Sequence, residues 1–163
     1  MQDYQEVTDV REFFSPYPYW SCSVFGFEYR PTEQVFQLVG TLLDFNVERG
    51  CRKFVDIQFT GVECFHKSVP KGYHSPYAAS PHRYEQQPDE RMVEVHDAST
   101  TTQKGKFKTV LEMTYLMGNI TLVYERVFIK VKIGRGVKTQ PDQWDYFDVA
   151  TGQRFDFYRP FAG

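Results

Sequence analysis

Hydrophobic and polar residues alternate most regularly between Lys106 and Met117. Apolar residues and threonine take the odd positions from Phe107 onward, whereas Lys106, Lys108 and Glu112 take even ones. A period of two residues is typical of a strand with one buried face. Gly118-Asn119 follows, and both residue types tolerate the positive φ of a two-residue hairpin turn. The pattern therefore predicts two strands joined at Gly118-Asn119.

The returning strand changes phase along its length. Apolar residues lie at even positions from Ile120 to Tyr124 and at odd positions from Val127 to Ile133. We expect either a bulge near Glu125-Arg126 or a strand that is covered on both faces. Gly134-Arg135-Gly136 then predicts the end of this strand.

Shorter patterns predict strands over residues 20–29, 35–45, 54–65, 91–96, 144–149 and 153–158. Gly26 and Gly61 each stand at a change of phase, which indicates a bulge. Residues 35–45 also fit a helix, but Gly40-Thr41 and the β-branched valines favour a strand. The last two strands predict a closing hairpin across Thr151-Gly152.

Three stretches depart from the strand pattern. Apolar residues at helical spacing predict one short helix over 7–14, which Ser15-Pro16 ends. Residues 67–88 hold four prolines and no sustained period, so we expect a long loop, and such loops are commonly functional or mobile. A polar loop is expected over 99–106.

These elements predict an all-β, mainly antiparallel fold, either a β-sandwich or an open barrel. A chain of 163 residues fits one domain over 1–163, with a C-terminal hairpin extension over 134–163. Aromatic residues make up 17% of the chain, and large rings suit strands and argue against disorder.

Charge and cysteine content narrow the class of function. Nucleic-acid-binding proteins usually carry a clustered basic face. The net charge of −2 and a pI near 6.1 give no such electrostatic signal, so we expect no nucleic-acid partner. The three cysteines show no CxxC spacing, which favours reduced thiols but leaves a disulfide open. The N-terminus has no leader pattern and no run is long enough to cross a membrane, so we expect a soluble, cytoplasmic protein.

Histidine offers one candidate chemistry. Cys64 and His66 would share a face of a strand and could form half of a zinc site. His74 and His82 follow at a spacing that fits no compact ligand pattern, and no nucleophile motif is present. We therefore expect neither a cofactor nor a catalytic activity, and a His/Cys metal-dependent enzyme stays as an alternative.

Surface recognition is the remaining candidate. Tyrosine, tryptophan and arginine are enriched at interface hot spots because they bury a large area and carry a polar group. The candidate partner-binding residues are Tyr73, His74, Tyr77, His82, Arg83 and Tyr84 in the long loop, together with Trp144 and Tyr146 near the C-terminus. The same rings could instead pack onto the sheet, and the sequence leaves both interpretations open.

The order of signals is similar to that of small bacterial β-rich families that include toxin-immunity proteins. The shared signals are Ser23–Tyr29 followed by a turn, Phe59-Thr60-Gly61-Val62, and Gly118-Asn119-Ile120-Thr121-Leu122. The resemblance implies a stand-alone cytoplasmic inhibitor that blocks a toxin, and it assigns no functional residue. We therefore expect a protein-binding module. The alternative is a structural or assembly subunit that forms homo-oligomers, with a viral origin as one version.

Overall fold

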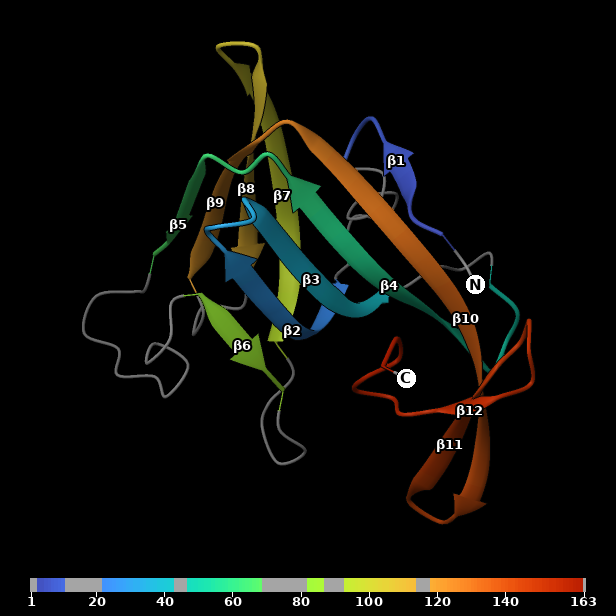
Figure 1. The fold of residues 1–163 in the computed structure, drawn as a ribbon. Helices are drawn as coiled ribbons and strands as arrows, with labels where there is room; N and C mark the ends of the chain where they lie inside the picture. Colours follow the sequence, from blue (N-terminus) through green and yellow to red (C-terminus); the bar gives the residue numbers. More distant parts are fainter. Residues whose placement is uncertain are drawn as a thin grey trace.

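The strands of this protein form one antiparallel sheet. The computed structural model describes residues 3–10, 22–42, 47–68, 82–86, 93–113 and 118–162, and none of them is helical. Along the sheet the order is β12-β11-β10-β4-β3-β2-β7-β8-β9-β5, with β1 beside β10 and β6 beside β2 (Figure 1). The all-β antiparallel prediction is confirmed, but the sandwich or barrel that it specified is not found, because this single sheet does not close.

The described strands have the following bounds: β1 Gln5–Val7, β2 Cys22–Arg30, β3 Val35–Leu42, β4 Cys51–Thr60, β5 Cys64–Lys67, β6 Arg83–Glu85, β7 Val93–Gln103, β8 Lys106–Met113, β9 Asn119–Tyr124, β10 Arg126–Gln140, β11 Gln143–Asp148 and β12 Arg154–Phe155. The predicted strand over 35–45 is confirmed as far as Leu42, since residues 43–46 lie outside the described ranges.

The sheet bends at two short connections, one between β4 and β5 and the other between β9 and β10. Residues 61–63 lead from β4 into β5, and Glu125 alone leads from β9 into β10. The Glu63 N–H donates to the Val123 carbonyl at 2.9 Å, and the Glu125 N–H donates to the Thr60 carbonyl at 3.0 Å. The β5–β9 pair therefore continues the β4–β10 pair round a corner, and this corner explains the phase change at Glu125.

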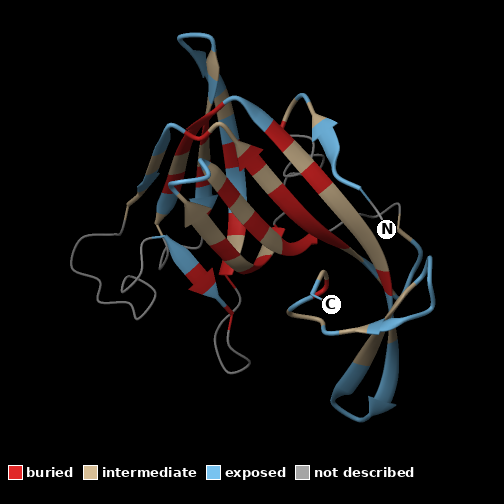
Figure 2. Cartoon of the chain, in the orientation of Figure 1, coloured by how far each residue is buried: buried red, intermediate tan, exposed pale blue. Residues whose placement is uncertain are grey.

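The inner side of the bend holds the core. The Phe65 ring of β5 stacks on Tyr29 of β2, with centroids 4.6 Å apart, and lies 5.6 Å from Phe36 of β3. Leu38, Ile57 and other buried side chains join them in one cluster, to which eight of the described strands contribute. Figure 2 shows the buried parts of the sheet in red. We call this side of the sheet the inner face and the opposite side the outer face.

The N-terminal helix and the long loop were predicted wrongly where the structure describes them. Val7 ends β1, no helix follows as far as Val10, and residues 11–14 lie outside the described ranges. Within 67–88, Lys67 ends β5, and Arg83–Glu85 form β6, which pairs with β2. The rest of that segment, 69–81 and 87–88, lies outside the described residues.

The predicted turn at Gly118-Asn119 is also wrong. Glu112 pairs with Asn119, and the Met113 N–H donates to the Gly118 carbonyl at 3.2 Å, so both Gly118 and Asn119 belong to the bonded part of the hairpin. Residues 114–117, which connect Met113 to Gly118, are not described. The two-residue positive-φ turn lies instead at Lys104, with φ of 50°, and Gly105, with φ of 78°. It joins β7 to β8, so the stretch predicted as a polar loop over 99–106 is a hairpin tip.

Three glycines that the sequence analysis singled out have different roles in the structure. The bulge predicted at Gly26 is confirmed by a register shift against β3 between Val24 and Gly26. The bulge predicted at Gly61 is wrong, because Gly61, with φ of 63°, begins the corner between two separate strands. β10 does not end at Gly134, where a Cβ would lie 2.5 Å from the Phe155 ring, so this glycine lets an aromatic ring approach the strand.

A candidate binding cleft on the outer face

The C-terminal segment covers part of the outer face with aromatic rings. Phe25 faces outward by the same alternation as Ser23, and Phe54 of β4 lies beside it. The bulge at Gly26 then returns Phe27 to the inner face. The Phe157 ring lies 4.9 Å from Phe25 and 5.5 Å from Phe54, and Phe155 lies 5.0 Å from Phe54. The closing hairpin predicted across Thr151-Gly152 is found in shortened form as β11 and β12. Phe155 lies in β12 and Phe157 follows it, so this hairpin positions both rings.

Two lysines of β10 are enclosed by the chain termini. The Lys132 ammonium lies 4.7 Å from the Phe155 ring centroid and donates a hydrogen bond to the Pro160 carbonyl. Burial lowers the pKa of Lys132. Lys130 lies over the rings of Tyr4 and Phe161. Both lysines are therefore packed against aromatic side chains of the terminal segments.

A buried carboxylate lies beside these lysines. Asp56 accepts a hydrogen bond from the Tyr4 hydroxyl at 2.6 Å and from the Gln37 amide nitrogen at 2.9 Å. Arg30 donates to the Gln37 side-chain oxygen at 3.1 Å, which orients the amide toward Asp56. Burial raises the pKa of Asp56 above its ordinary value, although these hydrogen bonds act in the opposite direction.

The β10–β11 hairpin extends beyond the rest of the sheet. β4 pairs with β10 only as far as Arg135. From Gly136 to Tyr146, β10 and β11 pair only with each other. We call residues 136–146 the arm. Trp144 is 53% exposed and Val137, on the opposite side of the arm, is 44% exposed. Figure 2 shows most of the arm in the colour of exposed residues.

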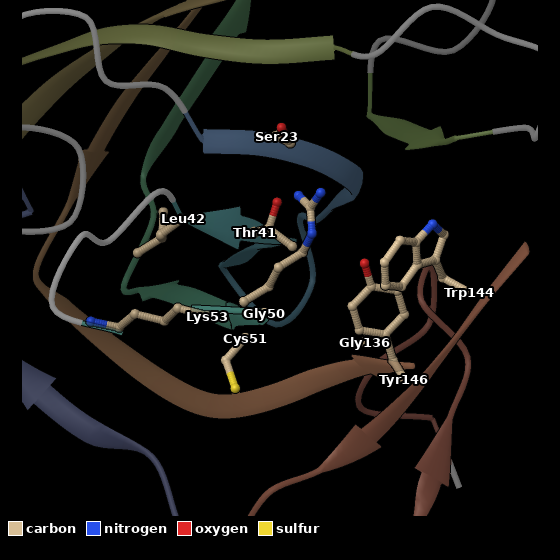
Figure 3. A pocket seen from close by; sticks show the side chains of 10 residues that line it. Ser23, Thr41, Leu42, Gly50, Cys51, Lys53, Gly136, Trp144 and Tyr146 are labelled. Atoms are coloured by element: carbon tan, nitrogen blue, oxygen red, sulfur yellow. The ribbon is translucent and has the colours of Figure 1, made fainter. Parts of the chain in front are cut away.

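A cleft of about 630 Å³ lies between the arm and the ends of β2, β3 and β4. Its lining residues are Ser23, Thr41, Leu42, Gly50, Cys51, Arg52, Lys53, Gly136, Trp144 and Tyr146. The rings of Trp144 and Tyr146 form one side, and the hydroxyl-bearing Ser23 and Thr41 form another (Figure 3). Lys53 and the Cys51 thiol extend away from the two rings (Figure 3). A volume of this size is ordinary for a ligand-binding pocket.

The predicted recognition residues separate into three groups. Trp144 and Tyr146 lie together at the cleft. Tyr84 is buried against Phe27, with ring centroids 5.8 Å apart, and donates a hydrogen bond to Gln86 at 2.5 Å. For Tyr84 the structure therefore supports the second of the two interpretations, packing onto the sheet.

The other predicted residues do not join the cleft. His82 packs edge-on against the rings of Tyr29 and Phe65, 5.4 Å and 5.6 Å away, and Arg83 is exposed beside a second hollow. Tyr73, His74 and Tyr77 lie outside the described residues.

Sequence reasoning missed the polar side of the cleft. Ser23 and Thr41 are cross-strand partners in β2 and β3, and Arg52 lies on the neighbouring strand β4. Each is a polar residue on the outward-facing parity of an otherwise apolar strand, and that was the available signal. Strand order was needed to bring the three together, because the residues are far apart in the chain.

The metal-site residues are partly described. Cys64 and His66 share the exposed side of β5, as predicted for a strand. Among the described residues, no three histidine, cysteine or acidic side chains lie close enough to hold a metal ion. Cys22, Cys51 and Cys64 are all free thiols. Burial raises the pKa of the Cys22 thiol.

Comparison with known proteins adds no functional assignment. No protein-family model, no curated protein and no solved structure matches this chain. The similarity to immunity-protein families therefore stays a prediction. None of the described residues belongs to a helix that is long and apolar enough to cross a membrane.

Proposed function

We propose that the protein acts by binding another protein, and that the arm and its cleft form the binding surface. The observation that carries the proposal is Trp144, which is more than half exposed beside Tyr146 at the mouth of the cleft. Tryptophan, tyrosine and arginine dominate the energy of protein interfaces when a partner removes them from water. Arg52 completes this combination in the lining.

The geometry of the arm supports the same proposal. Trp144 lies opposite Lys138 on a two-stranded hairpin, and Tyr146 lies opposite Gly136. A hairpin holds such rings in a fixed orientation, so little side-chain entropy is lost when a partner covers them. The most concrete version of this function is an immunity-type inhibitor that uses the arm to block a toxin.

Affinity capture with matched variants tests the proposal. Tagged wild-type protein, Trp144→Ala and Phe107→Ala are used as bait in extracts of the source cells, and recovered proteins are quantified by mass spectrometry. Phe107 is the control because it is an exposed ring, 37% accessible, near the β7–β8 hairpin tip. We expect Trp144→Ala to reduce recovery of a stoichiometric foreign protein by about tenfold or more, and Phe107→Ala to leave it unchanged.

Two results would contradict the proposal. Equal recovery by all three baits would show that the arm is not the binding surface. Recovery of only further copies of this chain would favour a homo-oligomeric assembly subunit instead.

A further inference from the structure

The described residues that line the cleft carry charge of one sign. Among them, Arg52 and Lys53 are the charged residues and none is acidic. The chain as a whole is slightly acidic, with a net charge of −2. The second hollow on the outer face has Glu28, Asp56 and Glu85 in its lining. The positive charge is therefore a local property of the cleft.

Two described carboxylates near the cleft form ion pairs with other arginines. Glu48 pairs with Arg135 at 2.8 Å, and Asp145 pairs with Arg154 at 3.2 Å. Arg52 forms no ion pair with a described carboxylate; its guanidinium carbon lies 5.7 Å from the centroid of the Phe157 ring. Contact with a ring face leaves the N–H donors at the edge of the guanidinium available. Arg52 can thus be supported by a ring and still bind an anion.

The surroundings of Arg52 favour a carboxylate that is followed by an apolar group. Ser23 and Thr41 contribute hydroxyl groups on one side, and Trp144 and Tyr146 contribute ring surface on another (Figure 3). A guanidinium can bind a carboxylate with two parallel hydrogen bonds, which are stronger than bonds between neutral groups. An apolar side chain can then cover the exposed indole of Trp144.

We propose that the cleft binds an acidic segment of the partner protein, with a carboxylate at Arg52 and a neighbouring apolar side chain against Trp144. This inference rests on the proposed function for the identity of the occupant as part of a protein. The new property is a preference of the cleft for acidic over neutral peptide segments.

Two short peptides test this selectivity directly. The probes are the blocked tripeptides acetyl-Glu-Phe-Glu-amide and acetyl-Gln-Phe-Gln-amide, which differ in charge and little in shape. Binding is followed by tryptophan fluorescence of the full chain, and the signal from the cleft is the part that disappears in Trp144→Phe, since the chain has two tryptophans. We expect the Glu peptide to bind about tenfold more tightly than the Gln peptide, and added salt to reduce the difference.

Variants assign the selectivity to one side chain. Arg52→Gln should reduce the affinity for the Glu peptide to that for the Gln peptide. Arg52→Lys should retain part of the preference, because lysine keeps the positive charge but cannot donate two parallel hydrogen bonds to one carboxylate. Arg83→Gln is the matched control, because Arg83 is an exposed arginine in the lining of the other hollow. It should bind both peptides as the wild type does.

The outcomes separate this inference from the proposed function. Equal affinity for the two peptides, or an unchanged preference in Arg52→Gln, would overturn the inference even if affinity capture still depends on Trp144. A Glu preference that depends on Arg52, without capture of a foreign protein, would confirm the acidic selectivity and contradict the proposed function.

Discussion

Two short segments of this chain look alike in sequence and differ in the fold. His82-Arg83-Tyr84 and Trp144-Asp145-Tyr146 each combine aromatic rings with a charged residue. In the structure Tyr84 is 6% exposed and Trp144 is 53% exposed. One segment contributes to the core, and the other lines a cleft.

The pairing partner of each strand accounts for the difference. β6 pairs with the middle of β2, which places Tyr84 opposite Phe27 on the inner face. β11 pairs with the part of β10 that extends beyond β4, so Trp144 lies beyond the edge of the main sheet and stays exposed. Aromatic character therefore does not distinguish recognition from packing. The position of the strand within the sheet does.

The largest effect on stability is expected from Tyr84→Ala. Removing the buried ring leaves a cavity beside Phe27 and leaves the Gln86 side-chain oxygen without the Tyr84 hydroxyl. We expect the free energy of unfolding to fall by about 3 kcal/mol, measured by urea denaturation. Tyr84→Phe keeps the ring and should cost only about 1 kcal/mol. A melt of Tyr84→Ala that matches the wild type would show that the ring is not part of the core.

A smaller loss is expected where the arm leaves the sheet. A methyl group at Gly134 would lie within 3.0 Å of both the Phe155 and the Phe54 rings. Gly134→Ala should therefore lower the free energy of unfolding by about 2 kcal/mol through overpacking. At Gly136 the nearest ring atom, in Tyr146, is 3.1 Å away, so Gly136→Ala should cost less than Gly134→Ala. The reverse order in urea denaturation would contradict the described packing of the C-terminal rings.

Asp56 should give stability an unusual dependence on pH. Burial raises its folded-state pKa above the ordinary 3.8, so the folded protein holds this proton more tightly than the unfolded chain. The stability that Asp56 contributes is then fully present below pH 3.8 and is lost as pH rises through the raised pKa.

Comparison with Asp56→Asn isolates this effect. The difference in the free energy of unfolding, wild type minus variant, should fall as pH rises from about 3 to about 7. Urea denaturation at several pH values provides the measurement. A difference that rises with pH would mean that hydrogen bonds from Tyr4 and Gln37 outweigh burial.

The smallest effect on stability is expected at the arm itself. Trp144→Ala and Phe107→Ala each remove an exposed ring, and each should change the free energy of unfolding by no more than about 0.5 kcal/mol. Only Trp144→Ala should reduce partner capture. A large loss of stability in Trp144→Ala would place this ring with Tyr84 as a packing residue, and the contrast between the two segments would disappear.

Alternation along the chain was sufficient to predict most strands, because each has one buried face. It predicted the alternation of β8, the strand at Val35–Leu42 and the bulge at Gly26. It failed where a local sequence signal is compatible with more than one backbone structure. Gly118 has a positive φ outside any two-residue turn, and Lys104 occupies a turn position that composition did not reveal.

The candidate cleft was half predictable. Trp144 and Tyr146 stood out by residue type, whereas Arg52 and Thr41 became part of the site only through strand order. Pairings such as Ser23 with Thr41, or Gly134 with Arg52, join residues that no local pattern relates. Sheet topology depends on the whole chain, so the polar side of the cleft required the fold.

Site-specific photocrosslinking tests the central claim most directly. A photoreactive benzoylphenylalanine replaces Trp144 in one protein and Phe107 in another, and both are irradiated in extracts of the source cells. The account predicts a covalent adduct with one foreign protein from position 144 and none from position 107. An adduct from position 107 with none from position 144 would show that the arm is not the surface that meets the partner.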